Sequence, residues 1–136
     1  MISLKFKTSV ILRSNLSEIK NTIEGILHSM GEFLKQEDLI FDIRLILNEL
    51  VINSAIHGNN LDESKKIELK IEINDSSIKV EVVDEGEGFT YDKNAYNPLD
   101  LNPNGRGLVI VDGLSDELLI ESNRVEVVKY YNPIIS

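Results

Sequence analysis

Three polar side chains lie four residues apart in a segment that is otherwise strongly apolar. Glu49, Asn53 and His57 fall in the run from Ile46 to Gly58, which reads Ile-Leu-Asn-Glu-Leu-Val-Ile-Asn-Ser-Ala-Ile-His-Gly. On a helix this spacing places all three in one stripe. Polar groups inside an apolar helix cost about 1–3 kcal/mol each, or more, if they are left unsatisfied. We therefore expect the stripe to face a cavity that holds a polar ligand or an ion.

A second polar group is expected to point inward at the end of a strand. Counting on by twos from Val82 in an alternating segment puts Asp84 on the buried side, where a carboxylate needs hydrogen-bond donors. A buried acceptor of this kind can take an exocyclic amine. Gly86 and Gly88 follow it, and glycines there would let the chain pass close to a flat base.

A third segment has the composition of a phosphate site. Gly105 and Gly107 lie at an expected helix start, where backbone N–H groups and the positive end of the helix dipole attract phosphate. Arg106, between them, either reaches a phosphate or is simply solvated, and the sequence favours neither. Asn53 offers the hard oxygen that Mg²⁺ prefers. The three segments together predict a site for a nucleotide with its metal ion.

Composition excludes several other classes of protein. The chain has 136 residues and 42% hydrophobic content, which predicts one domain over residues 1–136. Fourteen Lys and Arg against 23 Asp and Glu give a net charge of −9, which argues against direct nucleic-acid binding. Cysteine is absent, and no apolar stretch approaches the roughly 20 residues that span a bilayer. We expect a cytoplasmic protein that does not enter a membrane.

Hydrophobic periodicity predicts the elements that hold these groups. In chain order they are a strand at 2–10, a helix at 16–34 started by Asn15 and Glu18, a helix at 37–57 ended by Gly58, hairpin strands at 67–73 and 78–82, a loop at 89–104, a helix at 105–111, and strands at 117–121 and 125–131. Long loops of this composition often close over a ligand, so we expect a lid that is mobile without nucleotide. The pattern predicts an α+β two-layer sandwich, with a mostly antiparallel sheet and three helices on one face.

These residues and spacings resemble the GHKL, or histidine-kinase-like, ATPase superfamily. Its three sequence boxes are similar here to Glu49-Leu-Val-Ile-Asn53-Ser-Ala-Ile-His57-Gly58 (N box), Asp84-x-Gly86-x-Gly88 (G1 box) and Gly105-x-Gly107-Leu108 (G2 box). The short chain, the His-Gly ending of the N box, the compact loop with Pro98 and Asp100, and the segment from Leu114 to Glu117 look most like the anti-sigma-factor serine/threonine kinases.

The resemblance implies a Bergerat-type ATP-binding fold and a protein kinase that uses ATP and Mg²⁺. It implies that the protein phosphorylates a STAS-type anti-anti-sigma protein, sequesters a sigma factor, and forms a homodimer. Glu49 would act as general base or orient the attacking hydroxyl, Asn53 would hold Mg²⁺, and Asp84 would read the adenine amino group. The nucleotide-binding set would be Asn53, His57, Asp84, Gly86, Gly88, Gly105, Arg106, Gly107 and Leu108. Among these, we favour a structural role for His57 at the helix end.

Three alternatives remain open. The pocket could serve as a nucleotide-binding switch without kinase activity, although Glu49 favours the kinase because mere binding has little use for a carboxylate near phosphates. The chain could be the ATP-binding domain of a split histidine kinase, an interpretation weakened by the short loop and by the absence of a dimerisation helix with a phosphoacceptor. The polar stripe could also be purely structural.

Overall fold

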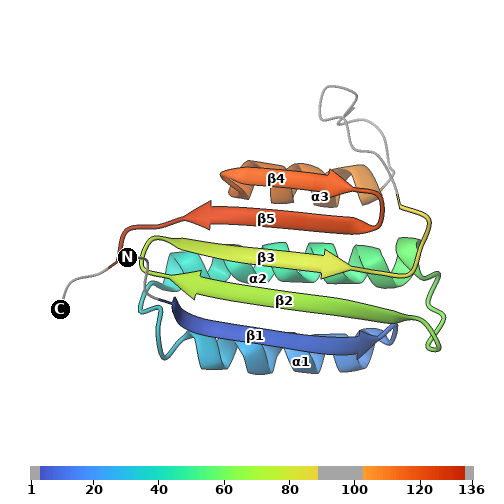
Figure 1. The fold of residues 1–136 in the computed structure, drawn as a ribbon, viewed down its shortest axis with the longest axis horizontal. Helices are drawn as coiled ribbons and strands as arrows, with labels where there is room; N and C mark the ends of the chain where they lie inside the picture. The colour runs from blue at the N-terminus through green and yellow to red at the C-terminus, as the bar shows by residue number, and fades with distance from the viewer. Residues whose placement is uncertain (1–3, 89–102, 134–136) are drawn as a thin grey trace.

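The computed structural model describes residues 4–88 and 103–133, with the side chains of 103–106 excepted. Within this part of the chain, five strands form one sheet, and three α-helices and a π-helical turn pack on one of its faces (Figure 1). The elements in chain order are β1 (Leu4–Arg13), α1 (Leu16–Met30), α2 (Glu37–Asn53), η1 (Ser54–Gly58), β2 (Lys66–Asn74), β3 (Ser77–Val83), α3 (Pro103–Leu114), β4 (Glu117–Glu121) and β5 (Arg124–Tyr130). The predicted α+β two-layer fold is confirmed.

The sheet is antiparallel throughout, with the strand order β1-β2-β3-β5-β4. One row of paired residues crosses all five strands, from Thr8 through Ile71, Val80 and Val127 to Leu118. Ile71, Val80 and Val127 are fully buried in this row, because alternate side chains of a strand point to the same face. This face lies under the helices and forms the core.

The opposite face of the sheet is charged, and its side chains pair across the strands. Lys79 lies 3.1 Å from Glu126, and Arg124 contacts both Glu81, at 2.9 Å, and Glu126. Cross-strand pairs of opposite charge stabilise an antiparallel sheet. The outer face therefore satisfies much of its own charge.

Helix α1 begins where the sequence predicts. The side chain of Asn15 accepts a hydrogen bond from the N–H of Glu18 at 3.1 Å, which is the N-cap contact. The helix is shorter than predicted, because it ends at Met30 and the chain continues in a turn. Leu34 is nevertheless buried, at 3% exposure. The apolar spacing therefore predicted correctly that Leu34 is buried, but it did not predict where the helix ends.

The boundaries of the other two helices also differ from the prediction. Helix α3 begins at Pro103, two residues before the expected start, since proline suits the first helical position. Helix α2 ends at Asn53, and the next five residues form a π-helical turn in which the N–H of Asn59 donates to the carbonyl of Ser54 at 2.8 Å. The wider turn breaks the fourfold spacing, and His57 is exposed instead of stacking on Asn53.

The expected lid at 89–104 is described only at its end. Residues 103 and 104 already belong to α3, and the rest of the segment lies outside the described residues. In the described part of the chain, every helix is too short or too polar to cross a membrane.

Candidate functional site

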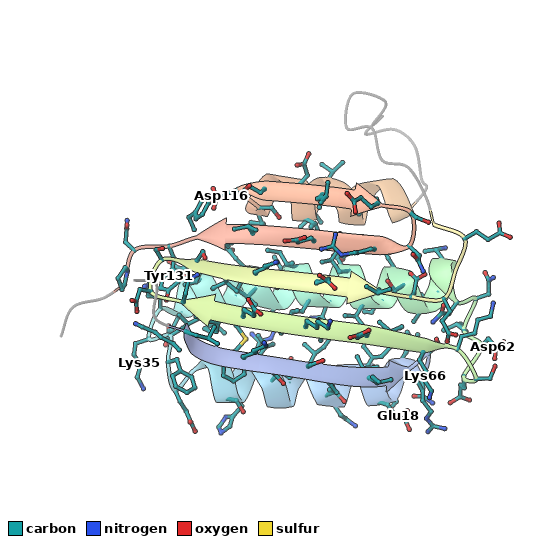
Figure 2. The ribbon with its side chains drawn as sticks, viewed as in Figure 1. Glu18, Lys35, Asp62, Lys66, Asp116 and Tyr131 are labelled. Atoms are coloured by element: carbon teal, nitrogen blue, oxygen red, sulfur yellow. The ribbon has the colours of Figure 1, made fainter. Side chains whose placement is uncertain are left out.

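The candidate site lies at the end of the sheet where β1 and β3 finish and β2 begins. Figure 2 shows Lys66 and Asp62 at this end and Tyr131 at the opposite end. The turn after α2 arrives here as well, because Asn59 bonds to the backbone of Lys66. The N-box helix and the segment after β3 therefore meet.

Asp84 is buried at this junction, at 6% exposure, as the alternation of β3 predicts. The N–H of Gly86 donates to its Oδ1 atom at 2.8 Å. Its backbone is held by Asn123 in the turn between β4 and β5: the Asp84 N–H donates to the Asn123 carbonyl at 3.2 Å, and the Asn123 amide donates to the Asp84 carbonyl. Among the described residues no donor reaches Oδ2, so this buried carboxylate keeps an acceptor for a ligand.

Glycines allow the surrounding backbone to close on that carboxylate. A Cβ atom on Gly58 would overlap both oxygens of Asp84, and a Cβ on Gly86 would overlap the carbonyl of Gly58. Gly88 has φ of +88°, and a Cβ there would overlap the backbone of Ser122. The structure thus gives Gly86 and Gly88 a packing role; their predicted role of making room for a base stays a prediction.

The start of α3 packs against the polar stripe of α2. A Cβ on Gly107 would overlap Oε2 of Glu49 and lie 3.5 Å from Nδ2 of Asn53. Both side chains are half-buried, and neither makes a hydrogen bond or an ion pair with any residue that the structure describes. Two polar groups with unused bonding capacity therefore lie side by side at the first turns of α3.

The other G2-box residues divide by position in α3. Gly105 lies in the first turn, where backbone N–H groups lack helical partners and can face phosphate. Gly107 is the fifth residue, so a regular helix already pairs its N–H, and Glu49 leaves no room for a Cβ there. Its predicted role in seating phosphate stays a prediction. Leu108 is buried at 6% exposure, and Val111 of the same helix lies in the core cluster. The side chain of Arg106 lies outside the described residues.

One residue of this region was missed by the sequence analysis. Asn59 is fully buried and donates from Nδ2 to Ser14 Oγ at 3.0 Å and to the Lys66 carbonyl at 3.1 Å. Its Oδ1 accepts the N–H of Glu85 at 2.9 Å. No pattern in the sequence separates it from its exposed neighbour Asn60, because both look like turn residues after a helix.

The donor set fits a nucleotide with Mg²⁺. Asp84 offers a buried acceptor for an amine, and the side-chain amide of Asn53, whose Nδ2 lies 3.5 Å from the Cβ position of Gly107, carries the hard oxygen that Mg²⁺ prefers. Within the described residues no three His, Cys, Asp or Glu side chains gather as a metal site. A Mg²⁺ ion here would suit the usual arrangement of one or two protein ligands completed by phosphate and water.

Comparisons with known proteins agree with this geometry. Residues 13–129 match the histidine kinase-like ATPase domain family. Over 92 residues the chain is 33% identical to the anti-sigma F factor of Clostridium botulinum (strain Eklund 17B / Type B), which is 64% of each protein. It is 31% identical over 90 residues to the anti-sigma F factor of Geobacillus stearothermophilus, which is 62% of each.

A third relative, the anti-sigma F factor of Clostridium novyi (strain NT), is 34% identical over 88 residues, 61% of this chain and 62% of that protein. The chain thus spans somewhat less than two thirds of the length of the curated relatives it matches. The family match, by contrast, runs from the end of β1 into β5 and includes all three boxes. This chain belongs to the histidine kinase-like ATPase domain family.

Proposed function

We propose that this protein binds ATP with Mg²⁺, sequesters a sigma factor, and phosphorylates a serine or threonine of a STAS-type anti-anti-sigma protein. The observation that carries the proposal is the contact of Gly107 with Glu49 beside Asn53, which joins the G2 box to the N box. The contact of Gly58 with Asp84 joins the N box to the G1 box in the same way. The names of the relatives support the sigma-factor part of the proposal.

The half-buried Glu49 would act on the attacking hydroxyl of the acceptor protein. Its carboxylate would accept the proton of the attacking hydroxyl or hold that hydroxyl in line, as positioned acid–base groups do. Phosphoryl transfer depends mainly on positioning and on neutralising charge, so a small set of groups suffices. Asn53 would hold Mg²⁺, and that ion supplies positive charge beside the phosphates when bound.

Separate elements would bind the adenine end and the phosphate end of the nucleotide. Asp84, which keeps Oδ2 without a described donor, would accept the exocyclic amine of adenine. Gly105 and its neighbours in the first turn of α3 would direct N–H groups toward phosphate. This division predicts that changes at Asp84 and at Glu49 affect different measurable steps.

The test of the whole proposal combines the protein with Mg-ATP and the STAS-type protein encoded nearest to it, followed by intact-mass measurement. A phosphoryl mass increase on the STAS protein is expected, and a sigma factor should be recovered in a pulldown with Mg-ATP or Mg-ADP. Light scattering should give a homodimer. Nucleotide binding without phosphorylation would favour the switch without kinase activity, and failure to bind nucleotide would refute the proposal.

A further inference from the structure

Asn59 connects four separate segments at the candidate site. Its side chain reaches Ser14 after β1, Lys66 at the start of β2 and Glu85 after β3, and its backbone N–H closes the π-helical turn at Ser54. The orientation of the amide is set by chemistry, because the Lys66 carbonyl can only accept and the Glu85 N–H can only donate. The side-chain amide of Asn59 is fully buried, and both its nitrogen and its oxygen make hydrogen bonds to these three segments.

The position of Asn59 relates it to the buried carboxylate. It follows Gly58, whose missing side chain makes room for Asp84, and it bonds to the N–H of Glu85, the residue after Asp84. Asn123 holds Asp84 from the other side through the two backbone bonds already described. The segment that carries Asp84 is thus held between two asparagines, one on each side.

We infer that Asn59 is a positioning residue that holds the Asp84 carboxylate where it reads the exocyclic amine of the base. The inference rests on the proposed nucleotide function and adds a residue that sets its base selectivity. Asn59 does not have to touch the ligand. Without its amide, the N–H of Glu85 and the carbonyl of Lys66 lose a buried partner, and the segment after β3 loses its hydrogen bond to the turn after α2.

The readout is selectivity between ADP and inosine diphosphate, measured by calorimetry with Mg²⁺ on the full chain. Inosine carries a carbonyl where adenine carries the amine, so only ADP gains from a correctly placed Asp84. The unaltered protein should prefer ADP. Asn59→Ala should lower that preference by roughly tenfold, through weaker ADP binding and with inosine diphosphate binding little changed.

A matched control separates positioning from stability. Asn74 lies at the other end of β2, and its Oδ1 accepts from the N–H of Ser76, the N–H of Ser77 and the hydroxyl of Ser77 at 2.8–3.0 Å. Asn74→Ala should lower the thermal midpoint and leave the preference for ADP unchanged. If Asn59→Ala behaves in the same way, with lower stability and full selectivity, the inference is overturned.

Two further outcomes are distinguishable. If Asn59→Ala does not fold, Ser14→Ala removes one acceptor of the same amide and should give a smaller fall in selectivity; unchanged selectivity there refutes the inference. If the unaltered protein binds neither diphosphate, or binds both equally, the proposed function itself fails at Asp84.

Discussion

The carboxylate of Asp84 lies directly against the α-carbon of Gly58, with no space for a side chain between them. One residue ends the π-helical turn after α2 and the other follows β3, so the contact joins the helical layer to the sheet at the candidate site. Asp84 is 6% exposed, and its Oδ1 accepts the N–H of Gly86. This bond fixes the orientation of the carboxylate and therefore the direction of Oδ2.

Asp84→Asn should remove most nucleotide binding. The amide presents a donor where the adenine amine needs an acceptor, and an unsatisfied buried pair costs about 1–3 kcal/mol. Calorimetry with Mg-ADP and Mg-ATP measures the loss. Unchanged affinity in this variant would show that Asp84 does not contact the base.

Glu49→Ala should separate binding from chemistry. Its carboxylate lies at the start of α3, away from the Gly58 contact of Asp84, so we expect nucleotide affinity to be retained. Phosphotransfer to the STAS-type protein should fall on the order of 10²–10⁴-fold, the usual effect of a positioned acid–base group. If the variant phosphorylates at the rate of the unaltered protein, Glu49 has a structural role, and the nucleotide-binding switch without kinase activity is favoured.

Gly107→Ala should impair phosphotransfer without unfolding the protein. The new Cβ would overlap only the far end of the Glu49 side chain, which can turn away, and alanine favours a helix over glycine by about 1 kcal/mol. We expect the displaced carboxylate no longer to meet the acceptor hydroxyl, and we expect nucleotide affinity to be retained because Asp84 is unchanged. Gly113→Ala in the same helix is the control, because nothing lies within 4 Å of its Cβ position. Equal phosphotransfer rates in the two variants would contradict the prediction.

Glu126→Gln should destabilise the sheet in a pH-dependent way. Burial alone would raise the pKa of Glu126, but hydrogen bonds and charges from Lys79 and Arg124 outweigh it and hold the pKa below its usual value. A lowered pKa adds stability that is present above the unfolded-state pKa and is lost as the pH falls through the folded-state pKa. We expect a deficit of about 1 kcal/mol above the ordinary pKa of glutamate, about 4.3, that shrinks as the pH falls through the lowered folded-state pKa.

Urea unfolding across this pH range measures the deficit of Glu126→Gln. Glu121→Gln is the matched control, because Glu121 lies 3.6 Å from the same Arg124 but its side chain is 64% exposed. The control should show little deficit at any pH. A deficit for Glu126→Gln that does not change with pH would mean that the charge of Glu126 is not its source.

The sequence predicted β2, β3 and α1 well because each of them shows a single dry face. The alternation in β2 and β3 and the helical spacing in α1 predict directly which residues are buried. The same alternation identified Asp84 as a carboxylate that points inward. Helix ends were less predictable. Apolar spacing continues past Met30 to Leu34 although the helix stops, since a turn can bury a leucine as well as a helix can.

The site was predictable where a residue type implies a chemistry. Glu49, Asn53 and Asp84 stand out because polar groups in apolar surroundings are costly, and the structure places the first two at Gly107 and the third at Gly58. Asn59 could not be found in this way. Its partners are two backbone groups and a serine far away in the sequence, and only the folded chain brings them together.

The π-helical turn makes the number of residues between Asn53 and Gly58 part of the site. An α-helix continued through this segment would rotate each later residue by a different amount and would direct Gly58 away from Asp84. Loss of one residue here, such as Ile56, would let the remaining four steps from Asn53 to Gly58 form one ordinary α-helical turn, which brings Gly58 back to nearly the same direction. The π-helical turn therefore takes up one residue more than an α-helical turn would, and Gly58 still meets Asp84.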